Sequence, residues 1–92
     1  MNTIVDDRNA SQKLTHTWFV CATPRVPLFH AREVVAWACL PGDLDKVESW
    51  VRKRKDMKRV RIAFEGDRKY HPRSCTRFHI YAVMAGFPAL KG

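Results

Sequence analysis

The segment from Asp43 to Tyr81 constrains the fold most, because a helical pattern in it is followed by two strand patterns. Asp43 is a typical helix N-cap, since its carboxylate can accept hydrogen bonds from the N–H groups of a first turn. Three apolar residues recur behind it at helical spacing: Leu44, Val47 and Val51. The pattern predicts one amphipathic helix from Leu44 to about Lys55.

Two later segments alternate between apolar and polar residues, which predicts strands. In residues 58–64 the predicted inward side chains are Val60, Ile62 and Phe64. The outward ones are Arg59, Arg61 and Ala63. In residues 75–84 the outward side chains include Arg77, His79 and Tyr81. If the two strands pair antiparallel around the ten-residue connection 65–74, both outward sets share a cationic sheet face, and the other face packs on the helix.

The earlier segments complete the predicted domain. Residues 14–22 (LTHTWFVCA) are rich in β-branched and aromatic residues and predict a first strand. Residues 30–40 fit a helix and a buried strand almost equally, and the stop signal Pro41-Gly42 slightly favours the helix. We therefore expect an α+β fold, with a small antiparallel sheet of about three strands and one or two helices packed on one face.

Composition sets the expected boundaries. Residues 1–13 are polar, have no period that would bury one face, and predict a flexible arm. Residues 14–85 form a single domain, which 46% apolar content allows to bury a modest core, and residues 86–92 form a short tail. No apolar run approaches the roughly 20 residues that span a bilayer, and the N-terminus has no signal region, so we expect a cytoplasmic protein that does not bind membranes.

The positive charge is confined to the second half of the chain. From position 51 onward there are 12 Lys and Arg against three Asp and Glu, whereas positions 1–50 carry five against six. A clustered cationic surface repels itself unless a polyanion or an acidic partner neutralises it. This distribution indicates nucleic acid or a ribonucleoprotein as partner, although an anionic membrane or an acidic protein would satisfy the same charge.

The candidate partner-binding residues follow this charge from the helix end to the last strand. They are Arg52, Lys53, Arg54, Lys55, Lys58, Arg59, Arg61, Arg68, Lys69, Tyr70, Arg73, Arg77 and Tyr81. The cations would contact a phosphate backbone, and the two tyrosines would stack on bases. A simpler interpretation is a solvated sheet face with charges that protect an edge, together with cations that stabilise a helix C-terminus.

Little in the chain suggests catalysis, a metal or a cofactor, and we expect none of the three. The cysteines Cys21, Cys39 and Cys75 are widely spaced, which fits reduced thiols, and zinc-ligand spacing is absent. A cysteine enzyme using Cys75 with His71 or His79 is the one catalytic hypothesis, and it lacks an identifiable orienting group.

As a whole, this short basic chain with a polar opening (MNTIVDDRNASQKL) and no catalytic set resembles the small phage-encoded anti-CRISPR proteins. It looks most like those that block type I-F surveillance complexes. The resemblance covers size, charge and texture over all 92 residues and carries no diagnostic motif. Anti-CRISPR proteins share no common fold, so it assigns no individual residue.

The resemblance implies a non-enzymatic inhibitor in the host bacterial cell. Such an inhibitor would dock on the Cas proteins and guide RNA of a surveillance complex and prevent target DNA from hybridising or engaging. Many of these inhibitors are acidic DNA mimics, and the net charge of +8 departs from that pattern. The alternative hypothesis, from the charge alone, is a free-standing nucleic-acid-binding regulator that contacts the phosphate backbone.

Overall fold

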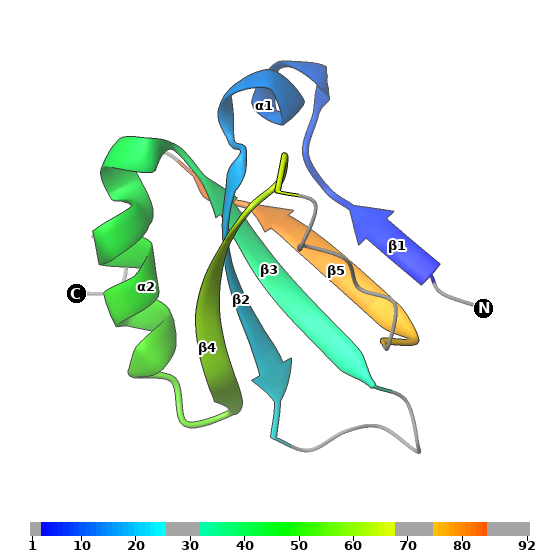
Figure 1. Ribbon diagram of the computed structural model, residues 1–92, viewed down its shortest axis with the longest axis vertical. Helices are drawn as coiled ribbons and strands as arrows, with labels where there is room; N and C mark the ends of the chain where they lie inside the picture. Colours follow the sequence, from blue (N-terminus) through cyan, green and yellow to red (C-terminus); the bar gives the residue numbers. More distant parts are fainter. Residues whose placement is uncertain (1–2, 26–31, 68–74, 85–92) are drawn as a thin grey trace.

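A five-stranded sheet forms the centre of the protein, with a short helix beyond one end and a longer helix against one face (Figure 1). The structure is a computed structural model that describes residues 3–25, 32–67 and 75–84. The elements in chain order are β1 (Thr3–Asp6), α1 (Ala10–Thr15), β2 (Trp18–Pro24), β3 (Glu33–Cys39), the 3-10 turn η1 (Pro41–Asp43), α2 (Leu44–Arg52), β4 (Met57–Phe64) and β5 (Arg77–Ala82). The α+β class agrees with the sequence prediction, but about three strands was an underestimate.

The sheet is mixed, with strand order β1-β5-β3-β2-β4. β2 pairs antiparallel with both β3 and β4, whereas β5 runs parallel to both β1 and β3. Two strands therefore separate β4 from β5. The expected antiparallel pair of these two strands does not form, so their outward side chains do not share one surface.

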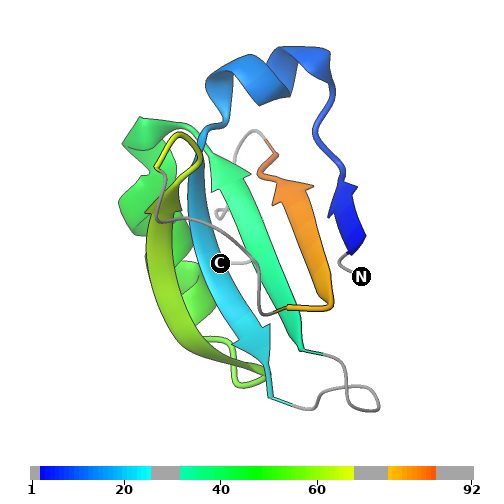
Figure 2. The same cartoon turned by 45° about the vertical axis from the view of Figure 1, so that its right-hand side comes forward.

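Alternate residues of the strands build two apolar clusters, one on each face of the sheet. The first cluster contains Phe19, Cys21, Ala36, Ala38, Cys75, Phe78 and Ile80. The second contains Val20, Ala22, Trp37, Cys39, Val47, Val51 and Val83. Figure 2 shows that α2 lies against one face, where Val47 and Val51 enter the second cluster. Trp18 and Trp50 are half-buried against the same cluster.

Helix α2 begins where the sequence predicts and ends sooner. Asp43 occupies the N-cap position, but its side chain makes no capping hydrogen bond, because η1 immediately precedes the helix. The helix ends at Arg52 rather than near Lys55, and a short turn then leads into β4.

The segment 30–40, for which a helix was slightly favoured, contains strand β3 in its described part. Residues 36–39 of β3 are buried in succession, so this strand is covered on both faces and carries apolar residues at successive positions rather than at alternate ones. Ala36 and Ala38 enter the first cluster, while Trp37 and Cys39 enter the second. This burial on both sides accounts for the continuous apolar run that also fits a helix.

The N-terminal residues also differ from the prediction of a flexible arm. Thr3–Asp6 forms β1 against β5, and Ala10–Thr15 forms α1. The side chain of Asn9 accepts from the backbone N–H of Gln12 at 2.8 Å, and the Gln12 side chain accepts from the N–H of Asn9 at 2.9 Å, which completes a capping box. The first predicted strand is correspondingly shorter, beginning at Trp18 rather than Leu14.

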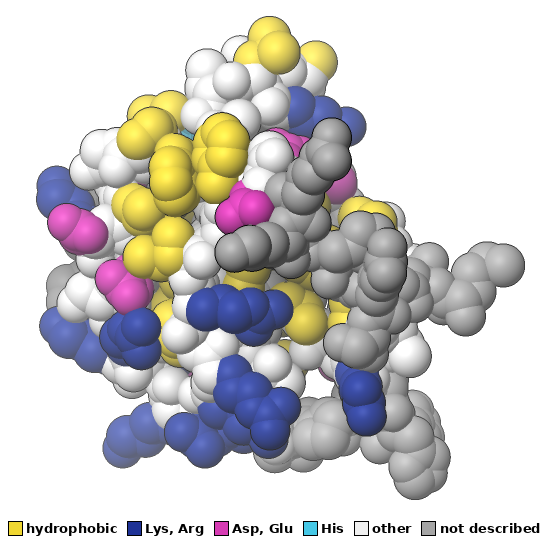
Figure 3. Space-filling view, in the orientation of Figure 1, with side chains coloured by type: hydrophobic (Ala, Val, Ile, Leu, Met, Phe, Trp, Pro, Cys, Tyr) yellow, Lys and Arg dark blue, Asp and Glu magenta, His cyan; other side chains and the backbone are white. Residues whose placement is uncertain are grey.

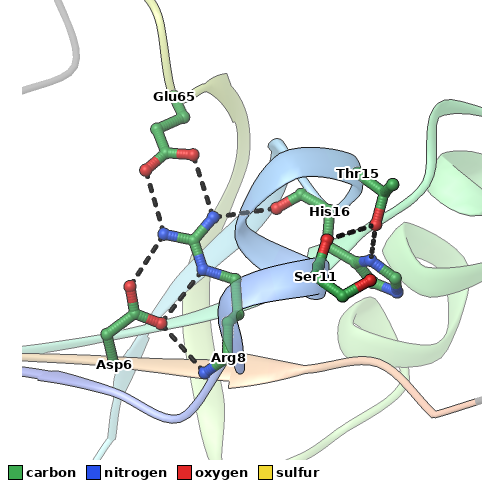
Figure 4. A network of polar contacts seen from close by, with 6 residues as sticks. All are labelled: Asp6, Arg8, Ser11, Thr15, His16 and Glu65. Atoms are coloured by element: carbon green, nitrogen blue, oxygen red, sulfur yellow. Dashed lines mark hydrogen bonds and ion pairs between the residues drawn. The ribbon is translucent and has the colours of Figure 1, made fainter.

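Arg8 joins this N-terminal segment to the far end of β4 (Figure 4). Its guanidinium is buried and makes five hydrogen bonds: two to Asp6, two to Glu65 and one to the carbonyl of His16, at 2.8–3.0 Å. The guanidinium carbon also lies 5.1 Å from the centroid of the Phe19 ring. The bonds from Arg8 hold the pKa of Asp6 below its usual value. This group is called the Arg8 network below.

Candidate nucleic-acid interface

Cationic side chains gather where α2 ends, β4 begins and β2 ends (Figure 3, lower part). The local chain path explains the gathering: the turn after α2 leads straight into β4, and Pro24 at the end of β2 pairs with Met57. The backbone N–H of Arg25 donates to the carbonyl of Asp56 at 2.9 Å, which ties β2 to the same turn. We call this surface the basic patch; it comprises Arg25, Arg52, Lys53, Lys55, Lys58, Arg59 and Arg61.

The basic patch is poor in neutralising carboxylates. Arg52 forms an i,i+4 ion pair with Glu48 at 2.9 Å, on the exposed side of α2. For the other six cations, no carboxylate of a described residue lies within ion-pair distance. All six are exposed except Lys58, which is half-buried. Such a surface attracts phosphate, and added salt weakens that attraction.

Arg54 was predicted to belong to this surface, and the structure gives it a different environment. Its guanidinium forms an ion pair with Asp56 at 2.7 Å and lies over the rings of Trp50 and Trp37, 4.9 and 5.5 Å from their centroids. The hydrogen bonds to Asp56 raise the pKa of Arg54. Arg54 therefore covers the edge of the second apolar cluster, with its charge already matched.

Arg59 occupies a β-bulge in β4. The pairing register between β2 and β4 shifts between Cys21 and Thr23, so that an additional β4 residue lies opposite Ala22. Arg59 has a φ of 57°, a left-handed backbone conformation that residues other than glycine adopt at a cost in free energy. Beyond the bulge the predicted alternation holds: Val60 packs on the second cluster, whereas Arg61 lies opposite Cys21 of the first.

Apolar side chains adjoin the patch along the same strand. Ile62 and Phe64 are each 39% exposed, although both were expected to face inward. Their exposure has a simple reason, since β4 is the last strand in the sheet order. Phe64 contacts Trp18 across the strand pair, with ring centroids 4.9 Å apart. Figure 3 shows hydrophobic side chains gathered above the cationic ones on this face.

Arg77 and Tyr81 lie on β5, apart from the patch. They share the α2 side of the sheet with His79, and all three line a hollow of about 180 Å³ together with Glu33, Val34 and Val35. We call this the β5 hollow. Sequence reasoning missed Glu33, because its approach to Arg77 depends on the parallel pairing of β3 with β5. It also missed Arg25, which only the pairing of β2 with β4 brings to the basic patch.

Four predicted site residues lie outside the described part of the chain: Arg68, Lys69, Tyr70 and Arg73. His71, a partner in the cysteine hypothesis, lies there too. The structure therefore brings together only the predicted residues Arg52, Lys53, Lys55, Lys58, Arg59 and Arg61.

The three cysteines of the catalytic hypothesis and of the thiol prediction lie inside the protein. Cys21, Cys39 and Cys75 are all buried. Burial raises the pKa of Cys75 and, more strongly, raises that of Cys39 to about 11, so both thiols stay protonated at neutral pH. Cys75 belongs to the first apolar cluster, whereas His79 lies on the opposite face of the sheet. Within residues 3–25, 32–67 and 75–84, no three His, Cys, Asp or Glu side chains form a group that could hold a metal ion.

In the described part of the chain, no helix is long and apolar enough to cross a membrane. No protein-family description, curated protein or solved structure matches this chain.

Proposed function

We propose that the protein is a non-enzymatic inhibitor that binds the guide-RNA ribonucleoprotein of a type I-F CRISPR surveillance complex and blocks target DNA hybridisation or engagement. The observation that supports this proposal is the basic patch, where six exposed or half-exposed cations have no carboxylate of a described residue within reach. A phosphate backbone supplies the missing negative charge. The choice of this ribonucleoprotein rests on the resemblance to anti-CRISPR proteins.

The surroundings of the patch favour a partner that contains protein as well as RNA. A partner that offered only phosphates would need only cations on this protein. Ile62 and Phe64 add a partly exposed apolar surface on the same strand. Protein interfaces typically combine aromatic residues and arginine in this way. A protein subunit beside an exposed guide-RNA backbone would contact both parts of β4 at once.

A free-standing regulator that binds nucleic acid is the second candidate. It is favoured by the position of the cations at one corner of the protein, on the turn and on two strand ends, where they can track a backbone without any protein partner. In that case the apolar part of β4 would contribute little to affinity.

The test compares two matched double variants, each of which changes the net charge by the same amount. Lys53→Glu/Lys55→Glu alters the patch, and Lys13→Glu/Lys46→Glu alters exposed lysines on α1 and in the first turn of α2. Binding to a purified surveillance complex and to its guide RNA alone would be measured at about 0.15 M salt, where nonspecific attraction is partly screened. Target DNA hybridisation would be followed in the same samples.

We expect the patch variant to lose binding to the complex by about 100-fold, since several phosphate contacts turn repulsive, and the control to lose less than about threefold. Hybridisation should be blocked by the unmodified protein and restored by the patch variant. Equal affinity for complex and free guide RNA would instead favour the free-standing regulator. No binding to either would refute both candidates.

A further inference from the structure

Part of the sheet face that carries α2 remains uncovered by that helix. α2 packs mainly on β2 and β4, whereas β1 and β5 lie further along the same face. The strand registers place side chains there in rows across β1, β5 and β3: Thr3 with Arg77 and Glu33, and Val5 with His79 and Val35. The β5 hollow lies over these rows. Its volume of about 180 Å³ is smaller than the roughly 300–1,000 Å³ of pockets for drug-sized ligands.

Aromatic rings form a stack that ends at the hollow. The Trp37 and Tyr81 centroids are 6.3 Å apart with planes at 29°, and the Tyr81 and His79 centroids are 4.0 Å apart with planes at 21°. His79 Nε2 donates to Asp7 Oδ2 at 2.9 Å, which fixes the imidazole. One face of the imidazole is covered by Tyr81, and the part of the side chain that remains exposed, 20%, borders the hollow. A planar ring placed there would add a layer without ordering any side chain first.

A cation and a carboxylate border the same space. Arg77 is 49% exposed, and its Nη1 lies 3.9 Å from Glu33 Oε1, which is too far for a hydrogen bond. The guanidinium can therefore bind an external anion without breaking a strong internal contact. The Glu33 carboxylate, which is 19% exposed, can accept a hydrogen bond from a ligand amino group.

From these three features we infer that the β5 hollow binds one nucleotide of a single-stranded nucleic acid. The base stacks on the outer face of His79, Arg77 contacts the phosphate, and Glu33 accepts from an exocyclic amino group of the base. The inference rests on the proposed function only in taking nucleic acid as the ligand, because the site itself lies on a different strand from the basic patch.

The test titrates the full-length protein with cytidine 5′-monophosphate and follows the ring resonances of His79 and Tyr81 by NMR. We expect saturable shifts at both rings. Ribose 5-phosphate, which lacks the base, should bind at least about tenfold more weakly, because stacking is lost. Arg77→Ala should weaken nucleotide binding by about tenfold through loss of a charge-assisted contact. Lys46→Ala, which removes an exposed cation in the first turn of α2, outside the basic patch, should leave it unchanged.

Three results would overturn the inference: no saturable shift at His79, equal binding of ribose 5-phosphate, or equal losses from Arg77→Ala and Lys46→Ala. The second would identify an anion site without base recognition. The Lys53→Glu/Lys55→Glu variant separates this outcome from failure of the proposed function. Suppose that this variant no longer binds the surveillance complex, and that cytidine 5′-monophosphate causes no shift of the His79 resonances in the unmodified protein. The proposed function would then be supported, and the nucleotide site would be refuted.

Discussion

Arginine side chains at the two ends of β4 lie in opposite environments, one buried and ion-paired, the other exposed and without a described carboxylate partner. Beyond its last residue, Glu65 helps to enclose Arg8, which is buried with two carboxylates and a carbonyl around its guanidinium. Near its start, Arg59 and Arg61 are exposed, and no carboxylate of a described residue pairs with them. A buried cation needs partners inside the protein, because desolvation without them is expensive. The exposed group stays in contact with water and salt, which screen its charge, so it needs no carboxylate inside the protein.

Removing Arg8 should produce the largest loss of stability. Arg8→Ala removes five hydrogen bonds of a buried guanidinium and leaves the partly exposed carboxylates of Asp6 and Glu65 without a cation, which should cost about 3 kcal/mol. Urea unfolding would measure it, with Arg61→Ala as a surface control expected to change stability by less than about 0.5 kcal/mol. Similar losses from both variants would remove the contrast between the two ends.

The pH dependence of the same network gives a smaller effect. Because the pKa of Asp6 is lowered in the folded protein, the unfolded chain binds its proton more readily. The contribution of Asp6 is therefore complete above about pH 5 and is lost as the pH falls through the folded pKa. Asp6→Asn should lower the free energy of unfolding by about 2 kcal/mol at neutral pH, as expected for hydrogen bonds to a charged group. The difference between the two proteins should shrink as the pH falls into the acid range, and a constant difference would contradict the assignment.

The bulge predicts a gain in stability. Arg59→Gly relieves the positive φ and should stabilise the protein by about 1 kcal/mol, as glycine adopts this conformation without penalty. Arg61→Gly is the matched control, because Arg61 lies outside the bulge and glycine inside a strand is destabilising by roughly 0.5–1 kcal/mol. Thermal unfolding should thus show changes of opposite sign. A loss at both positions would mean that the Arg59 side chain contributes more than its backbone strain.

The smallest effect on stability should come from the patch itself. Lys53→Ala should change the free energy of unfolding by less than about 0.5 kcal/mol, since the side chain is exposed at the end of α2. Its effect should appear in binding instead, as a decrease of about 0.7 in the slope of log affinity against log salt for single-stranded RNA. An unchanged slope would place Lys53 outside the contact surface.

Local patterns predicted four elements: α2 from its apolar stripe, β2 from its β-branched and aromatic residues, and β4 and β5 from alternation. β3 was ambiguous, because burial on both faces removes the periodicity that separates a strand from a helix. β1 was missed because a four-residue strand carries little signal, and the contact between Arg8 and Glu65 spans 57 positions.

The same distinction applies to the candidate sites. Apart from Arg25, the cations of the basic patch are close in sequence, from Arg52 to Arg61, so the helix-to-strand turn was enough to group them. Placing Arg77 and Tyr81 required the strand order, which no local pattern contains. That order moved them to the β5 hollow beside Glu33.

The position of β5 has a consequence for how the chain folds. β5 is the last described strand in sequence, yet it lies between β1, the first, and β3. Until residues 77–82 are available, β1 lacks the neighbour it pairs with, and β3 presents an unpaired edge that is rich in apolar residues. Pairings this distant in sequence close slowly, on the scale of roughly milliseconds to seconds for folds dominated by them. A nascent chain that lacks β5 would therefore expose an incomplete sheet with an apolar edge, which is prone to aggregate. The pairing of β5 with β1 and β3 would complete the sheet late in folding.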